Sequence, residues 1–272
     1  MLSQDQSIDV LLLAGDRQPM DPWVQSLGVP GKALIPLGGT PLLQRVLSTL
    51  ATWSPCRRVV LVSPAGAGYE RAIIASKFPR DRLIWRAPMP KLYDSVIDGL
   101  HQPDVFEQCG LIVSADHGLL NHAWLDAVCS SISKDVDVSL GMAGWSLVMH
   151  AFPEARRTRY RFSDQSLCGG NLFAFKMPAF EKILKVWARV ESERKKPWKM
   201  LSMLGPLSVA KYLAGRLDSA EAFSRLSKAT GTRIKPTIVH DPAVSVDVDS
   251  PEDLRLAERI LRERIAAPKV IE

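Results

Sequence analysis

A short apolar run near the N-terminus, followed at once by two small residues, places the strongest limit on how this chain can fold. Residues Val10 to Leu13 are all aliphatic, and Ala14 and Gly15 follow them directly. A continuous apolar run of this kind is typical of a strand that is buried on both faces of a parallel sheet. The small residues after it allow the backbone to approach a ligand closely. We therefore expect a central buried strand with a ligand-binding loop at its carboxyl end.

Further strand-like segments alternate with helical patterns through the first half of the chain. The pattern predicts strands at 58–62, 82–85, 110–114 and 136–140 and helices at 41–50, 68–78, 93–100 and 119–132. Such alternation is typical of an α/β fold with a mostly parallel central sheet. In these sheets ligands bind at the carboxyl ends of the strands, so we expect the site to lie near Gly15 and Asp116.

The whole chain of 272 residues is expected to form a single domain, because its 46% hydrophobic content suffices for one large core. Residues 191–235 are interpreted as a helical insertion within that domain. The residues Gly169-Gly170-Asn171 predict a turn. Late strands are predicted at 234–239 and 244–248, followed by a helix that begins at Pro251 behind the N-cap residue Ser250.

Basic and apolar residues gather between positions 194 and 204 of the insertion. The basic residues are Arg194, Lys195, Lys196 and Lys199, and the apolar ones are Trp198, Met200, Leu201, Met203 and Leu204. One interpretation is an interfacial helix that makes peripheral contact with a membrane. The alternative is a basic amphipathic helix that packs on the domain or on the partner in a homodimer.

The amino-acid composition excludes some classes of protein but does not identify a substrate. The net charge of +6 suits anionic small molecules, but the basic residues are dispersed and aromatic residues total 7%, so we expect no nucleic-acid partner. The four cysteines show no metal-binding or disulfide spacing. The polar stretch 1–9 and the absence of a long apolar run lead us to expect a cytoplasmic protein.

Two aspartates directly follow predicted strands. Asp116 follows the strand at 110–114, and Asp249 follows the strand at 244–248. Carboxylates at two strand ends can jointly bind Mg²⁺, which prefers hard oxygen ligands and often keeps phosphates in its coordination shell. The alternative for each aspartate is that it caps a neighbouring helix.

Three arginines alternate along the segment 157–161. In a strand, Arg157, Arg159 and Arg161 would lie on one face, since alternate side chains point the same way. Such a face can clamp the phosphate of an acceptor, because arginine binds phosphate in a bidentate manner. The alternative is an ordinary solvated strand face.

These motifs together resemble those of the molybdenum-cofactor guanylyltransferase-like (MobA-like) nucleotidyltransferases, which include sugar-phosphate and polyol-phosphate cytidylyltransferases. The matching segments are Leu13-Ala14-Gly15-x-Arg17, Lys32 with 38–43, the strand that ends before Asp116, Gly169-Gly170-Asn171, and 249–254. The resemblance covers most of the chain outside 191–235. It implies a Rossmann-like three-layer sandwich of the nucleotide-diphospho-sugar transferase type.

The resemblance also implies an activity and roles for residues. Members transfer NMP from an NTP, here CTP or GTP, to a phosphorylated small-molecule acceptor with release of pyrophosphate. The nucleotide-binding residues would be Leu13, Ala14, Gly15, Asp16, Arg17, Lys32 and Ser95, of which Arg17 and Lys32 would be catalytic together with Asp116. Acceptor binding would involve Arg159, Arg161, Gly170 and Asn171. The Mg²⁺ ligands would be Asp116 and Asp249.

The first loop departs from the family pattern, because Asp16 and Arg17 follow Gly15 at once where the family usually has a further glycine. Fewer glycines leave less backbone freedom to wrap phosphates. Two alternatives therefore stand beside nucleotidyl transfer. One is a nucleotide-sugar glycosyltransferase of the GT-A type, for which Asp247-Val248-Asp249 has the required Asp-x-Asp spacing. The other is a non-catalytic nucleotide-binding module.

Overall fold

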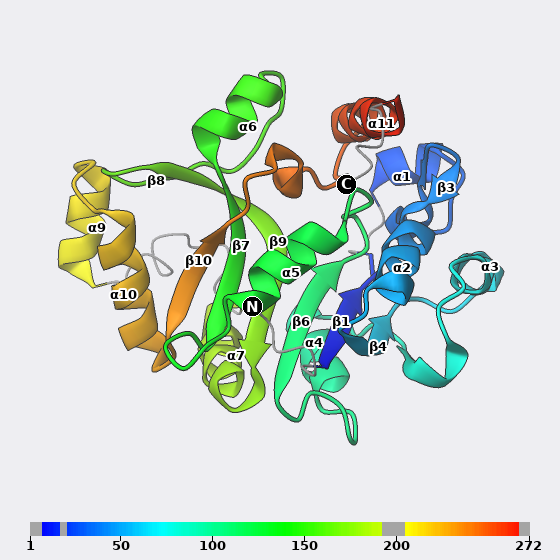
Figure 1. Ribbon diagram of the computed structural model, residues 1–272, viewed down its shortest axis with the longest axis horizontal. Helices are drawn as coiled ribbons and strands as arrows, with labels where there is room; N and C mark the ends of the chain where they lie inside the picture. The colour runs from blue at the N-terminus through cyan, green and yellow to red at the C-terminus, as the bar shows by residue number, and fades with distance from the viewer. Residues whose placement is uncertain (1–6, 17–20, 192–204, 267–272) are drawn as a thin grey trace.

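One large sheet forms the centre of the structure, a computed structural model that describes residues 7–16, 21–191 and 205–266 (Figure 1). The strand order is β10-β7-β9-β6-β1-β4-β5, and the short β8 pairs with the start of β9. The strands are β1 (Ile8–Leu13), β4 (Cys56–Val62), β5 (Leu83–Arg86), β6 (Cys109–Ser114), β7 (Val138–Gly144), β8 (Tyr160–Arg161), β9 (Ser166–Lys176) and β10 (Ile234–Ile238). A separate pair consists of β2 (Pro36–Leu37) and β3 (Thr40–Pro41).

The sheet is mostly parallel, as the alternation of segments predicted. The central strand β1 is parallel to both of its neighbours, β4 and β6. The pairs β4 with β5 and β7 with β10 are also parallel. Strand β9 is antiparallel to β6 and to β7 and lies between them. The carboxyl ends of β1, β4 and β6 therefore lie at one edge of the sheet.

Helices cover both faces of the sheet and complete a three-layer α/β sandwich (Figure 1). The helices are α1 (Pro22–Ser26), α2 (Leu42–Thr52), α3 (Ala67–Ala75), α4 (Leu92–Leu100), α5 (His122–Ser130), α6 (Trp145–Ala151), α7 (Met177–Glu191), α9 (Pro206–Leu213), α10 (Ser219–Thr230) and α11 (Pro251–Ala266). The described residues also contain the short 3₁₀ helices η1 (Lys32–Leu34), η2 (Arg80–Arg82) and η3 (Pro242–Ser245).

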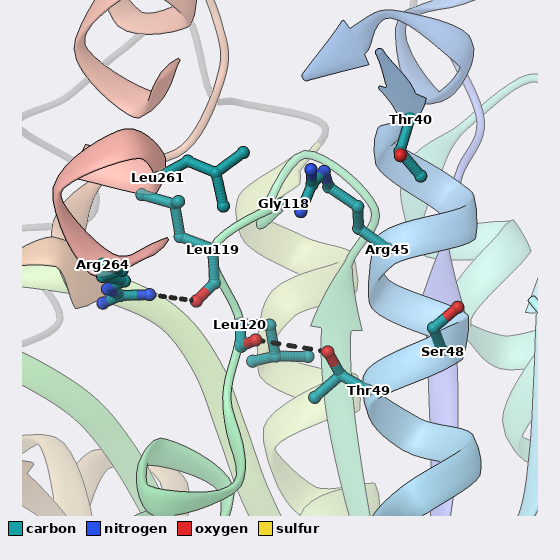
Figure 2. Close-up of a pocket in the computed structure, with 9 residues that line it drawn as sticks. All are labelled: Thr40, Arg45, Ser48, Thr49, Gly118, Leu119, Leu120, Leu261 and Arg264. Atoms are coloured by element: carbon teal, nitrogen blue, oxygen red, sulfur yellow. Dashed lines mark hydrogen bonds between the residues drawn. The ribbon is translucent and has the colours of Figure 1, made fainter. Parts of the chain in front are cut away.

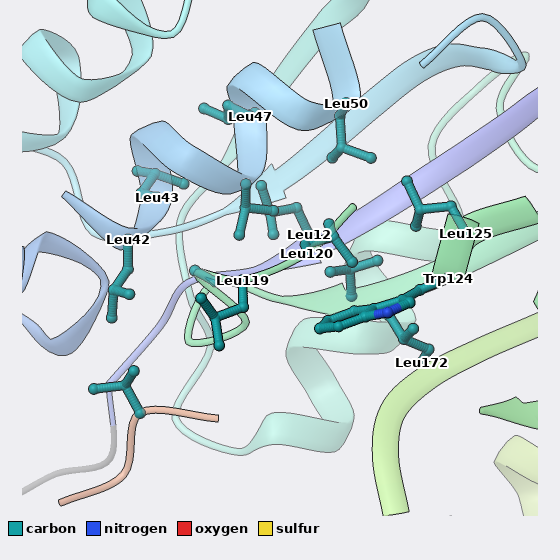
Figure 3. Packing of buried hydrophobic residues seen from close by; sticks show 14 of the residues in the cluster. Leu12, Leu42, Leu43, Leu47, Leu50, Leu119, Leu120, Trp124, Leu125 and Leu172 are labelled. Atoms are coloured by element: carbon teal, nitrogen blue, oxygen red, sulfur yellow. The ribbon is translucent and has the colours of Figure 1, made fainter. Parts of the chain in front are cut away.

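Successive residues of β1 pack into different cores, because side chains alternate between the two faces of a strand. Val10 and Leu12 are fully buried in the core that contains residues of α2, α3, α5 and α11. Figure 3 shows Leu12 in this core near Trp124 of α5. Leu11 is fully buried on the opposite face, where it packs with residues of α4 and α7. Burial of each such leucine contributes about 1.5–3 kcal/mol, so β1 is anchored from both sides.

The segment 244–248 is not the strand that its sequence predicted. Residues Pro242 to Ser245 form η3, and the residues after it run extended without pairing in a sheet. Asp241 starts this turn, because its side chain accepts a 2.9 Å hydrogen bond from the backbone N–H of Ala243. Val248 then donates a backbone hydrogen bond of 3.1 Å to the carbonyl of Asp116. This single bond ties the late segment to the end of β6.

The predicted turn at 169–171 lies inside β9 instead. Gly170 is needed there for close packing, because a Cβ on it would lie 3.0 Å from the carbonyl oxygen of Gly141 and 3.2 Å from that of Val244. Asn171 has a φ of +49°, and the pairing of β9 with β7 shifts register nearby. These features mark a β-bulge, which bends a strand and redirects a side chain.

In the region predicted as a helical insertion, the described part contains α9 and α10, and β10 begins at Ile234. The cluster at 194–204 lies outside the described residues. None of the described helices is both long enough and apolar enough to cross a membrane.

Candidate active site

Three carboxylates meet at the carboxyl end of β6. One oxygen atom from each of Asp116, Asp247 and Asp249 lies within 4.8 Å of the other two. Asp116 is two residues past the end of β6, and the other two follow η3. The hydrogen bond from Val248 to the Asp116 carbonyl holds the two segments side by side. The structure thus brings together the two aspartates proposed from the sequence and adds a third, Asp247.

Lys32 places its ammonium group inside this cluster. Its Nζ donates a 2.6 Å hydrogen bond to Oδ2 of Asp116 and also contacts Oδ1 of Asp249. The backbone N–H of Lys32 donates a 2.9 Å hydrogen bond to Oδ1 of Asp16, which fixes the start of η1. Although desolvation lowers the pKa of Lys32, the charges of the two carboxylates raise it above its ordinary value. Lys32 is therefore a permanent cation of the site.

Arg157 and Asn171 hold the third carboxylate in place. Arg157 donates from Nη1 to Oδ1 of Asp247 at 2.9 Å and from Nη2 to Oδ1 of Asp253 at 2.5 Å. Asn171 donates from Nδ2 to the other oxygen of Asp247 at 2.8 Å. Asp253 is itself part of the cap of α11, since it accepts a 2.6 Å hydrogen bond from the Ser250 hydroxyl. The site is thus linked to the first turn of α11.

The cluster carries more negative charge than the described cations beside it neutralise. Desolvation, followed by the charges of Asp116 and Asp249, raises the pKa of Asp247 to about 6. Asp116 has a buried oxygen, Oδ1, with no hydrogen-bond partner among the described residues. Three clustered carboxylates with a deficit of positive charge, and a buried carboxylate oxygen of Asp116 without a partner, fit a divalent cation such as Mg²⁺.

Comparison with known proteins now identifies the family. The model of the MobA-like NTP transferase domain matches residues 11–159, which include Lys32 and Asp116. The chain belongs to this family. It is accordingly a nucleotidyltransferase. No curated protein matches its sequence significantly.

Solved structures support the fold of this nucleotidyltransferase. A hypothetical transferase from Thermus thermophilus is 26% identical, with a TM-score of 0.76, and the match covers 91% of this chain and 99% of that one. A CMP:2-keto-3-deoxy-manno-octonic acid synthetase in complex with CTP is 14% identical, with a TM-score of 0.57 and coverage of 95% and 99%. A 2-C-methyl-D-erythritol 4-phosphate cytidylyltransferase, also from Thermus thermophilus, is 15% identical, with a TM-score of 0.53 and coverage of 94% and 99%. All three share the nucleotide-diphospho-sugar transferase fold with this chain.

The first loop of the nucleotidyltransferase begins at the expected edge of the sheet. The backbone of Leu13 and Ala14 is held between β4 and β6, because Ala14 donates to the Val62 carbonyl and Leu13 accepts from Ala115, both at 2.8 Å. Gly15 lies opposite the loop after β5, since a Cβ on it would be 3.2 Å from Pro88. Arg17 lies outside the described residues.

Asp16, the residue that departs from the family pattern, is turned toward η1. Besides the Lys32 backbone it accepts a 3.4 Å hydrogen bond from the Tyr69 hydroxyl. A Cβ on Gly31 would collide with both side chains, so glycine allows this close approach. The carboxylate of Asp16 thereby serves to position Lys32.

Ser95 of α4 also organises a loop. Its buried Oγ accepts a 2.8 Å hydrogen bond from the backbone N–H of Met89. The same hydroxyl lies 3.4 Å from the Met89 carbonyl, to which it donates. Ser95 therefore fixes the segment between β5 and α4, which faces the first loop through Pro88.

The three arginines at 157–161 do not share one strand face, which corrects the expectation from their spacing. Only Tyr160 and Arg161 belong to β8, and the residues before it have no regular structure. Arg157 is buried against the aspartates, whereas Arg159 stacks over Trp145 at 5.3 Å and donates to Ser166. Arg161 is exposed. The three arginines do alternate along the sequence, but residues 157–159 pair with no strand, so their side chains do not share a strand face.

Sequence reasoning missed Asp247 as a member of the carboxylate cluster and Arg157 as its partner. The Asp-x-Asp spacing of 247–249 was the available signal, but it was assigned to a competing function. Arg157 could not have been paired with Asp247 from the sequence, because 90 residues separate them.

Proposed function

We propose that this nucleotidyltransferase transfers NMP from an NTP, with CTP or GTP as the nucleotide, to a phosphorylated small-molecule acceptor. An oxygen of the acceptor phosphate attacks the α-phosphorus, the bond to the bridging oxygen of the β-phosphate breaks, and pyrophosphate leaves. The attacking oxygen is already anionic, so no strong general base is required. The observation that carries the proposal is the meeting of Asp116, Asp247 and Asp249 with Lys32 at the end of β6.

The metal ligands in this proposal are Asp116 and Asp249, with Asp247 as the third carboxylate. A bound Mg²⁺ would supply charge neutralisation at the phosphates and would help to hold the two substrates together. Asp247 is kept in position by Arg157 and Asn171, so its carboxylate needs little reorganisation when a cation binds.

Lys32, Arg17 and the first loop would hold the triphosphate. Lys32 stands between the carboxylates and the loop, where its charge can stabilise the leaving pyrophosphate. The backbone of residues 13–16 would face the phosphates, and the segment fixed by Ser95 would lie near the base and ribose. Most of the catalytic effect in this scheme comes from positioning and electrostatics.

The acceptor would bind on the side of β8 and β9. Arg159 and Arg161 can meet its phosphate there, and Gly170 and Asn171 belong to the strand that lies behind Asp247. The amide of Asn171 is already engaged with Asp247, so Asn171 would act mainly by positioning that carboxylate.

Pyrophosphate release tests the proposal directly. The four NTPs with Mg²⁺ are first screened by thermal shift, since a ligand that binds the folded state raises Tm. The stabilising NTP is then incubated with a library of phosphate esters, and pyrophosphate is measured. We expect Asp116→Asn to lose about 10²- to 10³-fold in turnover, the scale of one preorganised electrostatic group. Glu252→Gln is a matched control, because Glu252 is exposed and pairs only with Arg255 among the described residues.

A glycosyltransferase is the competing activity, and Asp247 and Asp249 lie together as an Asp-x-Asp pair would. The same experiment separates the two, because a glycosyltransferase releases a nucleoside diphosphate from a nucleotide sugar and no pyrophosphate from an NTP. Turnover of Asp116→Asn equal to that of the unchanged protein would contradict the proposal. The cytoplasmic location, the homodimer and the peripheral membrane contact through 194–204 stay predictions.

A further inference from the structure

A cavity lined by both polar and apolar side chains lies between α2, α11 and the loop that follows Asp116 and His117. Its volume is about 300 Å³, and Figure 2 shows the residues that line it. Helix α2 contributes Arg45, Ser48 and Thr49, and β3, which precedes it, contributes Thr40. The loop contributes Gly118, Leu119 and Leu120, and α11 contributes Leu261 and Arg264. None of these residues belongs to the carboxylate cluster.

Arg45 is the unbalanced charge of this cavity. Its Nε donates a 2.8 Å hydrogen bond to the Leu37 carbonyl, which fixes the direction of the side chain. Neither Nη atom has an acceptor or a carboxylate partner within the described part of the chain. Figure 2 shows the guanidinium extending from α2 toward the loop at Gly118. Partial burial lowers the pKa of Arg45, as expected for a cation without a counter-charge.

Two backbone carbonyls of the loop that lines the cavity already accept hydrogen bonds from side chains of α2 and α11. Arg264 donates from Nη1 to the Leu119 carbonyl at 2.9 Å, and Thr49 donates to the Leu120 carbonyl at 3.3 Å (Figure 2). The second Nη of Arg264 pairs with Asp241 at 2.8 Å, so that carboxylate is already balanced. Within the described part of the chain, the two Nη atoms of Arg45 and the hydroxyl of Thr40 donate to no acceptor, so these donors are available to a ligand.

We infer that this cavity binds a small oxyanion, such as the phosphate group of a metabolite, through the guanidinium of Arg45 and the hydroxyl of Thr40. A guanidinium fork binds phosphate oxygens in a bidentate manner, and charge-assisted hydrogen bonds are stronger than neutral ones. Leu261 and Leu119 provide an apolar wall on which the rest of such a molecule can pack. The inference stands apart from nucleotidyl transfer, because it uses none of the residues proposed for that reaction.

The test is a titration of the purified full chain with inorganic phosphate, without nucleotide and with a chelator to remove divalent cations. Ionic strength is held constant with potassium chloride, and Tm is measured at each concentration. We expect a saturable rise in Tm for the unchanged protein. Arg45→Gln is expected to weaken the apparent phosphate affinity at least tenfold, whereas Arg71→Gln, which removes an exposed arginine of α3, leaves it unchanged.

A second variant keeps the test decisive if Arg45→Gln does not fold. Thr40→Val removes the hydroxyl with almost no change in side-chain volume, and we expect it to weaken phosphate binding several-fold. Phosphate can also bind near Lys32. Only the part of the rise in Tm that is lost in Arg45→Gln or Thr40→Val is therefore assigned to this cavity. Identical titration curves for the unchanged protein and these variants, or no response in any of them, would overturn the inference while leaving nucleotidyl transfer intact.

Discussion

The Nζ atom of Lys32 lies 2.6 Å from Oδ2 of Asp116, in the cluster of carboxylates where we propose that the metal binds. Lys32 and a bound divalent cation would therefore compete for the same carboxylates. Lys32 is therefore expected to have two opposite effects. Its charge should weaken metal binding when no nucleotide is present, and it should favour catalysis once the phosphates are bound.

Replacement of Lys32 by methionine tests both effects, on metal affinity and on turnover. We expect Lys32→Met to bind Mg²⁺ or Mn²⁺ about tenfold more tightly in the absence of nucleotide, because it removes a competing positive charge whose effect is roughly 1.4 kcal/mol. The same variant should lose about 10²- to 10³-fold in turnover. Isothermal titration calorimetry gives the affinity, and Lys134→Met, at an exposed lysine, is the control. Unchanged or weaker metal binding in Lys32→Met would show that the two cations do not compete.

Arg157 is expected to be a stabilising residue as well as a positioning one. Its side chain is 8% exposed and bridges Asp247 and Asp253, which are also largely buried. Removal of one partner leaves buried carboxylates without compensation, so Arg157→Met should lower the free energy of unfolding by about 3–5 kcal/mol. Urea denaturation measures the change. A divalent cation should restore part of the loss by neutralising Asp247, and the exposed Arg255→Met should change little.

Gly170 is expected to tolerate no side chain. Because backbone carbonyls of Gly141 and Val244 lie 3.0 Å and 3.2 Å from the place of its Cβ, Gly170→Ala has to push β9 away from its neighbours. We expect a loss of about 1–3 kcal/mol in stability, the usual cost of overpacking. Gly169→Ala is the matched control, because the nearest atom to its added Cβ, on Tyr160, is 4.0 Å away. Equal stability of the two variants would refute the close packing.

The ion pair of Asp137 with Arg233 should make stability depend on pH in acid. Hydrogen bonds from Arg233 lower the pKa of Asp137 from 3.8 to about 2. The carboxylate therefore contributes stability that is complete above about pH 4 and is lost as the pH falls toward 2. Asp137→Asn should cost about 1–2 kcal/mol at pH 7, after allowance for solvent screening, and almost nothing at pH 2.

Chemical denaturation of the unchanged protein and Asp137→Asn across this range measures the difference. Asp81→Asn, at an exposed aspartate of η2, serves as the control for the general effect of charge. A difference between the unchanged protein and Asp137→Asn that stays constant from pH 7 to pH 2 would show that Asp137 is not stabilised by Arg233.

The parts of the fold that the sequence predicts well are those set by local pattern. The run Val10 to Leu13 has no polar side, so it had to be buried on both faces, and it forms the central strand. The alternation of strands and helices indicated a mostly parallel sheet, and Asp116 lies at a strand end because β6 is a simple apolar run. The segment 244–248 misled because its valines are buried although the segment does not pair in the sheet, and η3 packs against β7, β9 and α6. Burial outside a sheet gives the same sequence pattern as burial within one.

The sequence by itself therefore determined the mostly parallel α/β architecture and the position of Asp116 after the apolar run of β6, since both follow from neighbouring residues and their periodicity. It also pointed to Asp249 and to the edge of the sheet at which we propose that the ligand binds, although the strand from which Asp249 was inferred did not form. Only the tertiary structure decided that Asp247 completes the carboxylate cluster, that Arg157 turns inward to hold it, and that Arg45 is left without a counter-charge. Those outcomes depend on hydrogen bonds and charges between segments far apart along the chain. Such contacts form only when the sheet and its helices have brought the segments together.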